Sequence, residues 1–600
     1  MKIRRHSFLL VPALFTLGLI GSAAAQDEQI AKILPDSNAE KGATTPSSET
    51  PPTVFTRPNL SRVGVQTADP IPLTVNDAIR KALENNNSIE ISRDDVRIQE
   101  TAIRSLLGFY DPVFSVTPTY TRNSTTGSNA TSDFNVNADV LQFVRPGGGK
   151  VQGFFNNTRT ENAFSQAQVS SGSLGSSGVG AIFSSSAGVR YTQPLLRNFR
   201  IDNTRRNIRI ARRRLEQTDA DFRRQTIDII AQVQRTYWDL VFALRDQQNQ
   251  VANVNLAQEN LRQVEARIRA GAAAPLARAE IATELANRES ALLLSTQQVS
   301  ITENSLKQLV LRDAVSAEWS QSYVPTDKPA FSLNPMNLDA AVKDALDNRF
   351  ELRRLKLASD INAVDISYFK NQTKPQIDLN TTFSLDGLSR GGTNQEFQTN
   401  LFSSPAELSL LAAINDTRAN VDPPLSPITN TSITIPAQPN YLFGGFNRSL
   451  ANILRSNAPN YSIGVTFSFP LRNGTAKANL AGAQITQHQI ATQTRAQEQV
   501  VIVEVRNAVQ GVETARQRVL TAVRARENAE IQLAGERELF NAGRSTTFLL
   551  FQRENALTNA RNAEIRAETD YNKALADLQR STSTTFQLNN IEVDSPTDDK

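Results

Sequence analysis

Side chains that carry most enzyme and metal chemistry are scarce in this sequence. It has no cysteine and two histidines, and His6 lies in an N-terminal segment that we expect to be removed, which leaves His488. One histidine without cysteine predicts no metal site. The G-x-S-x-G, H-E-x-x-H and Walker motifs are missing. Gly147-Gly148-Gly149-Lys150 lacks the first Walker glycine and the final Ser or Thr, and predicts a turn. The sequence therefore predicts neither a catalytic site nor a cofactor.

Charge and composition also limit the possible functions. The 600 residues are 39% hydrophobic and 21% charged, and 64 basic against 60 acidic residues give a net charge of +4. This balance disfavours a nucleic-acid-binding protein, which would carry a concentrated basic face. Arg205-Arg206 and Arg212-Arg213-Arg214 are soon followed by acidic residues, so we interpret them as a solvated helix face.

The two ends of the chain predict processing and disorder. Residues 1–25 have a basic start, an apolar stretch and Ala23-Ala24-Ala25, which are typical of a secretory signal peptide. An uncleaved anchor is the alternative. Residues 26–70 are rich in Pro, Ser and Thr and predict a flexible tether, and residues 586–600 predict a disordered tail.

The rest of the chain contains an internal duplication. The segment 78–85 (AIRKALEN) matches 341–348 (AVKDALDN) with an offset of 263 positions, and Pro112 and Pro375 keep the same offset. A chance match would not stay in step at a helix-breaking proline so much further on. We therefore expect a first repeat at 71–325 and a second at 326–585.

Each repeat predicts two β-strands with one apolar and one polar face. Apolar and polar residues alternate strictly after Pro375 and again before Pro470, which is the pattern of a strand with two different faces. The first repeat shows the same alternation after Pro112 and before Pro194. The four predicted strands lie near 114–121, 187–191, 377–385 and 461–469.

Long helical hairpins follow these strands. Residues 202–270 and 475–542 contain no proline and little glycine, and such helices would extend roughly 100 Å. Apolar residues recur every three and four positions, as in Val512, Ala515 and Val519, which predicts a coiled-coil seam. Each run ends at Ala-Gly, and second helices are expected at 276–311 and 548–580.

Strands of this length with one apolar face suit a tilted crossing of a lipid bilayer. Lipid tolerates no open sheet edge, and about eight strands form the smallest barrel, so four strands per chain require several chains. The alternative is a soluble sheet whose apolar face packs on helices.

Several segments resemble the TolC-like outer-membrane efflux proteins, over about residues 72–585. Residues 73–86 (LTVNDAIRKALENN) are similar to the opening helix of that family. Residues 469–474 (FPLRNG) resemble its junction between strand and helix, with 193–196 (QPLL) as the first-repeat equivalent. Pro194, Pro470, Asn473 and Gly474 are the junction residues.

The resemblance implies an α+β membrane protein in the outer membrane of a Gram-negative bacterium, extending into the periplasm. It would be a homotrimer with a 12-stranded β-barrel continued by a 12-helix α-barrel, each chain giving four strands and two long helical hairpins. Its partners would be a periplasmic adaptor and an inner-membrane pump, and its function that of an export duct for efflux or type I secretion.

The resemblance also assigns individual positions. It places Gly271, Ala272, Gly543, Arg544 and Ser545 at the tip where the adaptor docks. Aspartates constrict the pore in several family members, and this chain has Leu549 and Gln552 there. An acidic gate is therefore not expected.

Two features leave alternatives open. The inserts 123–186 and 387–459 are longer than ordinary hairpin loops. They are either extracellular loops or contain extra strands, since Phe134, Val136, Val140 and Phe143 are unusual in loops. These polar inserts also fit a non-transport surface protein such as a coiled-coil adhesin. The cargo and the class of pump are not predicted.

Overall fold

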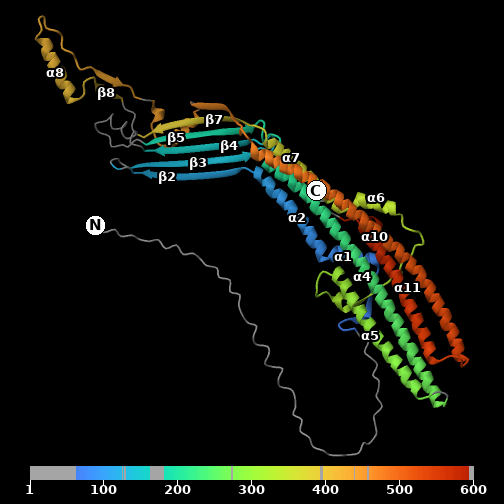
Figure 1. Cartoon of the computed structure of the whole chain (residues 1–600). Coiled ribbons are helices and arrows are strands. Elements are labelled where there is room, and N and C mark those ends of the chain that lie inside the picture. The colour runs from blue at the N-terminus through green and yellow to red at the C-terminus, as the bar shows by residue number, and fades with distance from the viewer. Residues whose placement is uncertain are drawn as a thin grey trace, which may run out of the picture. The chain divides into compact units, whose positions relative to one another are not determined.

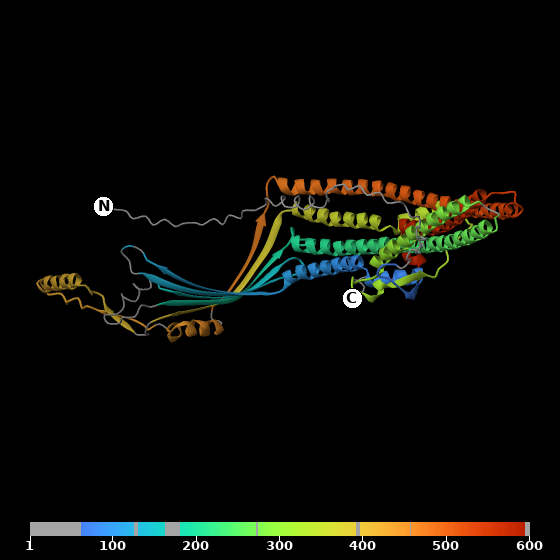
Figure 2. The ribbon, with the colours of Figure 1, turned by 90° about the horizontal axis from the view of Figure 1, so that it is seen from below.

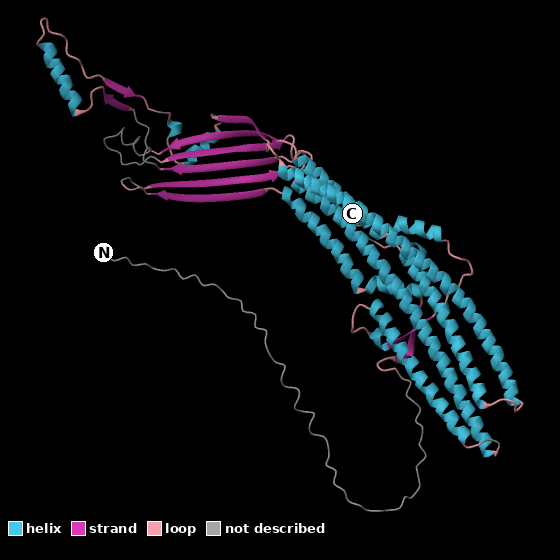
Figure 3. Ribbon diagram, viewed as in Figure 1, coloured by secondary structure: helices cyan, strands magenta, loops and turns pink. Residues whose placement is uncertain are grey.

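The computed structural model describes residues 62–124, 126, 130–161, 181–271, 274–391, 396–437, 439–455 and 458–593. All of them belong to one compact unit, Asn59–Lys600. The chain builds two kinds of layer, a β-sheet and a set of long helices (Figure 1, Figure 3). The predicted signal peptide lies outside the described residues.

Both repeats place two helices before their strands and a helical hairpin after them. The first repeat has the following elements: β1 (Gln66–Leu73), α1 (Val75–Asn85), α2 (Asn87–Leu107), η1 (Gly108–Tyr110), β2 (Val113–Asn123), β3 (Thr131–Phe143), β4 (Lys150–Thr160), β5 (Ile182–Pro194), α4 (Asn203–Arg269) and α5 (Leu276–Val310).

A short joint, η2 (Ala317–Ser320) and β6 (Gln321–Pro325), leads to the second repeat. Its elements are α6 (Leu338–Asn348), α7 (Phe350–Gln372), β7 (Gln376–Arg390), β8 (Phe397–Asn400), α8 (Pro405–Ala419), β9 (Ser432–Ile435), η3 (Asn440–Leu442), α9 (Phe446–Leu454), β10 (Pro459–Ser468), α10 (Gly474–Asn541), α11 (Thr547–Thr582) and α12 (Thr585–Leu588).

The main sheet has six strands, in the order β10-β7-β5-β4-β3-β2, and every neighbouring pair is antiparallel. The four predicted strands are confirmed as β2, β5, β7 and β10. The prediction of four strands per chain is wrong, because the first insert adds β3 and β4 to the sheet. Alternation is weaker in β4, where Phe154 and Phe155 are adjacent, so the sequence left the insert undecided.

One face of the sheet is apolar across strands from both repeats. Tyr120 lies opposite Phe134, and Val116 lies opposite Ala138. The same face continues through pairs such as Val189 with Phe383. The other face carries mainly Ser, Thr, Asn and Asp, as in the pair Thr117 and Asn137. Period-two alternation therefore separates an apolar from a polar surface over most of the sheet, and β4 is the exception, with Asn157 and Arg159 on the apolar face.

The second insert also adds structure, but outside the main sheet. β8 and β9 form a separate two-stranded sheet that carries α8 (Figure 1). α9 packs against β7 and β5, and its Ser449 Oγ lies 2.6 Å from Ser185 Oγ. Asn452 Nδ2 donates to Leu388 O at 2.8 Å. Leu388 lies beyond the end of β10, so α9 covers a stretch of β7 whose edge β10 does not reach.

The helical hairpins agree closely with the sequence prediction. α4 and α5 pack together, α10 and α11 pack together, and α4 also contacts α11 (Figure 1, Figure 2). Val512, Ala515 and Val519 are buried against Ala567 and Tyr571, which confirms the predicted seam. Among the described residues, no helix is both long and apolar enough to cross a membrane.

The largest core surrounds the N-terminal strand. β1 pairs in parallel with β6 from the joint, and both pack on α4 and α5. Tyr237 Oη lies 3.0 Å from both Leu73 O and Asp327 Oδ2. Burial raises the pKa of this phenol, so it remains a neutral hydrogen-bonding group.

Two predicted boundaries need correction here. The tether ends earlier than residue 70, because Gln66–Leu73 form β1. The prediction of a disordered tail is wrong for residues 586–593, because Phe586, Ile591 and Val593 pack on the main core. Both segments are short, and their apolar residues are too few to predict strand or core positions from sequence.

A buried ion cluster stabilises this core. Lys307 Nζ lies 2.8 Å from Glu303 Oε1, and the two side chains are 0% and 1% exposed. Arg62 also pairs with Glu303, and Lys307 donates to Gln321 O at 2.6 Å. The cluster connects α5 to the segment before β1 and to β6.

We expect Lys307→Met to lower the free energy of unfolding by about 3 kcal/mol, because it leaves the buried Glu303 with Arg62 alone and removes the hydrogen-bond donor of Gln321 O. Trp238 and Trp319, the chain's two tryptophans, both lie in this core. Their fluorescence during denaturant unfolding in detergent measures the change. The exposed pair Arg80–Asp77 gives the control. Arg80→Ala should cost about 0–1 kcal/mol, and equal effects of the two substitutions would contradict the assignment.

Candidate functional site

The strand-to-helix junctions of the two repeats each contain an asparagine in the left-handed conformation. Asn473 precedes α10 with φ 45°, and Asn198 precedes α4 with φ 67°. Asparagine tolerates this left-handed conformation better than most residues. Pro194 ends β5, and Gly474 is the first residue of α10. Pro470 lies just after β10.

These junctions also hydrogen-bond to the end of α7. Asn198 N donates to Asn371 Oδ1 at 2.8 Å, and Gln372 Nε2 donates to Asn198 Oδ1 at 2.7 Å. Asn473 Nδ2 donates to Thr373 O at 3.1 Å. These hydrogen bonds thus join three segments where the sheet meets the helices: the β5–α4 junction, the β10–α10 junction and the C-terminal end of α7. Asn198 was not predicted from the sequence, although Arg197-Asn198 repeats Arg472-Asn473 after the junction proline.

Both long hairpins end in a glycine with positive φ. Gly271 has φ 73° and Gly543 has φ 69°. Gly543 N donates to Phe540 O at 3.1 Å, and Arg544 N donates to Leu539 O at 2.9 Å. This bond pair is a Schellman motif, which closes a helix end and favours glycine. Ala272, the neighbour of Gly271, lies outside the described residues.

The second hairpin end presents an exposed surface. Arg544 is exposed, and Ser545 donates to Glu536 across the turn. Thr546 caps α11 by accepting from Leu549 N at 3.3 Å. Leu549 and Gln552 are both exposed on α11, whereas Leu550 is buried in the hairpin. Leu549 and Gln552 therefore face away from the core of their own hairpin.

Above the two ends, one side chain from each long helix enters a shared cluster. Glu554 of α11 is 4% exposed. Its carboxylate lies 3.6 Å from Arg288 Nη2 and 3.8 Å from Arg537 Nη2, and it accepts from Asn260 Nδ2 at 3.4 Å. These partners belong to α5, α10 and α4. The cluster therefore joins the first hairpin to the second.

Burial raises the pKa of the Glu554 carboxyl, and the nearby Arg288 and Arg537 oppose this rise. The desolvation of the charged form outweighs the attraction of the two arginines. Because the pKa is higher in the folded chain, folding favours the protonated form. Stability from this group is thus fully present below the ordinary carboxyl pKa and is lost as pH rises through the folded pKa.

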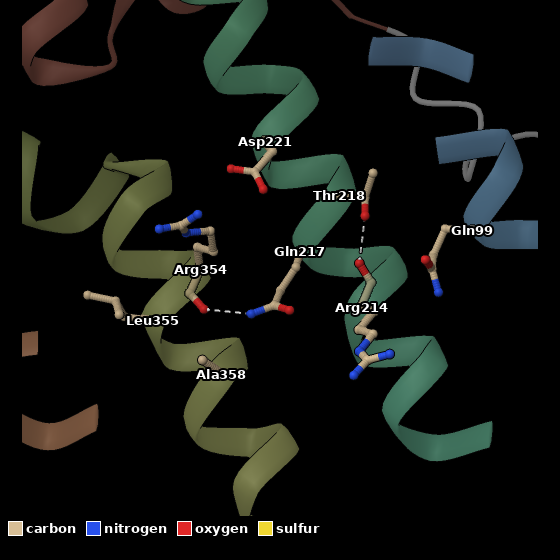
Figure 4. A pocket seen from close by; sticks show the side chains of 8 residues that line it. All are labelled: Gln99, Arg214, Gln217, Thr218, Asp221, Arg354, Leu355 and Ala358. Carbon is tan, nitrogen blue, oxygen red and sulfur yellow. Dashed lines mark hydrogen bonds between the residues drawn. The ribbon is translucent and has the colours of Figure 1, made fainter. Parts of the chain in front are cut away.

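A groove of about 360 Å³ lies between α2, α4 and α7 (Figure 4). Gln217 Nε2 donates to Arg354 O at 3.1 Å across it, and Thr218 Oγ1 donates to Arg214 O at 3.0 Å within α4. Its other side chains bring no base next to a nucleophile. No cluster of three or more metal-ligating side chains occurs among the residues that the structure describes.

The arginine-rich start of α4 has acidic partners. Arg213 Nη1 lies 2.8 Å from Glu216 Oε2 on the exposed face of α4. Arg206 Nε lies 2.5 Å from Asp365 Oδ1 of α7. The prediction of a solvated helix face is confirmed for residues 212–214, which are exposed. It is wrong for Arg205 and Arg206, whose side chains are 12% and 23% exposed.

The two edge strands of the six-stranded sheet are exposed. Tyr461 and Ile463 of β10 are 82% and 74% exposed, and Phe114 of β2 is 68% exposed. Each edge strand pairs on one side only. Apolar edge strands of this length are strong candidates for pairing with another chain.

Comparison with known proteins defines the class. The family model described as "Outer membrane efflux protein" matches residues 162–310 and 441–584, one segment in each repeat. The chain belongs to the outer membrane efflux protein family, whose members are transport ducts rather than enzymes. It is an efflux channel of the outer membrane of a Gram-negative bacterium, extending into the periplasm.

Solved structures support the fold. The Campylobacter jejuni CmeC outer membrane channel is 12% identical, with 92% of this chain and 98% of that chain covered and a TM-score of 0.54. The Neisseria gonorrhoeae MtrE outer membrane channel, in its open state, is 13% identical, with 90% and 97% covered and a TM-score of 0.53. VceC of Vibrio cholerae is 12% identical, with 85% and 95% covered and a TM-score of 0.53. No curated protein matches the sequence.

Glu554→Gln should remove one pH-dependent contribution to stability. We expect the unfolding free energy of the wild type, relative to this variant, to fall as pH rises above the ordinary glutamate pKa. Denaturant unfolding between pH 4 and pH 8 measures this difference.

Glu513→Gln is the matched control. Hydrogen bonds from Arg516 and Gln517 lower the pKa of Glu513 to about 2. Its contribution should therefore be present at neutral pH and decline as pH falls. If the unfolding free energy changed with pH in the same direction for both variants, relative to the wild type, the raised pKa assigned to Glu554 would be contradicted.

Proposed function

We propose that three copies of this chain form the outer-membrane duct of a tripartite efflux or type I secretion system. The exposed, apolar edges of the six-stranded sheet carry this proposal. An edge that faces lipid must find a partner, because lipid offers no hydrogen bonds to backbone groups. A second copy is the natural partner, since β10 and β2 run in opposite directions at the two edges.

In this assembly the apolar face of the sheet contacts lipid and the polar face lines the lumen. The four long helices of each chain, α4, α5, α10 and α11, continue the wall into the periplasm. Twelve such helices make a tube. Cargo passes through it without chemical change, so the energy for transport comes from an inner-membrane pump.

The hairpin ends are the proposed docking surface for a periplasmic adaptor. Gly271 with Ala272, and Gly543 with Arg544 and Ser545, form this tip. Leu549 and Gln552 follow within two turns of α11 and are proposed to line the narrowest part of the duct. Their exposure on the hairpin surface supports this role.

Purified protein in detergent should sediment as a trimer and conduct ions in a planar bilayer. Gln552→Asp would add three negative charges to the constriction of the proposed trimer. Under a salt gradient, the reversal potential should therefore shift toward the equilibrium potential of the cation. The equivalent position of the first hairpin, counted from its glycine, is Glu280. Glu280→Gln should leave selectivity almost unchanged. A purified protein that is monomeric and does not conduct ions would contradict the proposed function.

Gly543→Val should impair export, because a β-branched residue is strained by roughly 1–3 kcal/mol at a positive φ. No atom lies within 4 Å of the added Cβ, so the effect should stay local to the turn. Resistance to dyes and detergents in a complemented deletion strain measures export. Gly543→Asn is the control, since asparagine tolerates this conformation.

Both variants should reach the outer membrane in equal amounts. Full resistance with Gly543→Val would argue against a docking role for this turn.

A further inference from the structure

The insert between β2 and β5 forms part of the sheet itself. β3 pairs with β2 along 113–123, and β4 pairs with β5 along 150–160. β3 and β4 pair with each other over 133–143. β2 and β5, which would be neighbours in a four-stranded arrangement, are separated by this hairpin.

The inserted strand β3 keeps the two-faced character of the sheet, whereas β4 carries Asn157 and Arg159 on the apolar face and Phe154 on the polar face. Phe134, Val136, Ala138 and Val140 lie on the apolar face, and Val140 is opposite Phe114. The polar face of β3 carries Asn135, Asn137 and Asp139. Ser115 Oγ donates to Asp139 Oδ1 at 2.8 Å across this face. A hairpin projecting into water would not need an apolar face in register with its neighbours.

The turn between β3 and β4 is fixed where the sheet meets the helices. Gln193 Nε2 donates to Gly147 O at 2.8 Å. Gly148 has φ 69°, and a Cβ there would collide with Arg205 and Asn198 O. The ring of Phe143 stacks on Phe109 of η1 with centroids 4.3 Å apart. The turn of the β3–β4 hairpin thus lies at the end of the sheet that meets the helices, where β2 begins and β5 ends.

We infer that the β-barrel of the assembled channel has eighteen strands, six from each chain, instead of the twelve that the family resemblance implies. This inference rests on the proposed trimer. Barrel diameter grows roughly in proportion to strand number, so the membrane section is about half again as wide. Each chain still supplies four long helices, and the periplasmic tube therefore keeps its width.

Disulfide mapping tests the inference, because the natural chain has no cysteine. Val116 lies opposite Ala138, and Phe155 lies opposite Ala187. The pairs Val116→Cys with Ala138→Cys, and Phe155→Cys with Ala187→Cys, should each form a disulfide within one chain of the trimer. Single-cysteine variants are the controls and should form none within a chain.

The alternative is a twelve-stranded barrel with the hairpin pushed out of the wall. Val116→Cys would then form a disulfide with a cysteine at Ser185, Ala187 or Val189 of β5. This result would overturn the inference. We expect no such disulfide, because β3 and β4 lie between the two strands.

Accessibility gives a second, independent measurement. In liposomes, a membrane-impermeant maleimide should label Asn137→Cys and should not label Val136→Cys, because lipid covers the apolar face. Equal labelling of both positions would show a hairpin in water and would also overturn the inference.

The seam between chains separates this inference from the proposed function. Val116→Cys combined with a cysteine at Ile463, Val465 or Phe467 of β10 should give chain-to-chain disulfides. If trimers form disulfides both between chains at this seam and between β2 and β5 of one chain, the proposed function stands and the eighteen-stranded barrel is refuted. The absence of any trimer would refute both.

Discussion

Backbone hydrogen bonding at the edges of the sheet is the constraint on which the rest of this protein depends. Inside the sheet every strand has two partners, but β2 and β10 each have one. In water such edges would invite aggregation, and in lipid they are unacceptable. In the proposed trimer these edges meet those of neighbouring copies, so each chain supplies the partner strand that the next chain lacks.

In the proposed tube the helices meet a different constraint, because water surrounds them on both sides. Their seams bury small apolar residues such as Val512 and Ala515, but the contact between the two hairpins includes charged groups around Glu554. An apolar contact would hold the hairpins together regardless of conditions. A buried carboxylate between arginines makes their association depend on solvation and protonation. Strand pairing in the sheet is thus a permanent contact, whereas the contact between the two hairpins can change with the protonation of Glu554.

Much of this fold follows from local patterns in the sequence. The absence of proline over 202–270 and 475–542 predicted α4 and α10 to within one or two residues. Strict alternation predicted β2, β5, β7 and β10. The extra strands were only suspected, because Phe154-Phe155 interrupts the alternation in β4 and the sequence on either side of the two strands is rich in glycine. Asn198 was not predicted, because its Arg-Asn pair begins three residues after the junction proline, whereas the pair of the second repeat begins two residues after it. The Glu554 cluster joins four helices that are far apart in the chain, and no local pattern reports such a contact.

The inserted hairpin also shows how a barrel of this kind can grow. Its two strands run in opposite directions, so the chain enters β5 in the same direction as it would without them. In the proposed barrel, α4 therefore still starts on the periplasmic side of the membrane. A single added strand would have placed α4 outside the cell. Growth by hairpins therefore leaves all downstream architecture intact. The insert of the second repeat forms β8, α8 and β9 outside the main sheet. The two halves of the duplication have thus diverged, because one insert adds strands to the main sheet and the other forms a separate structure.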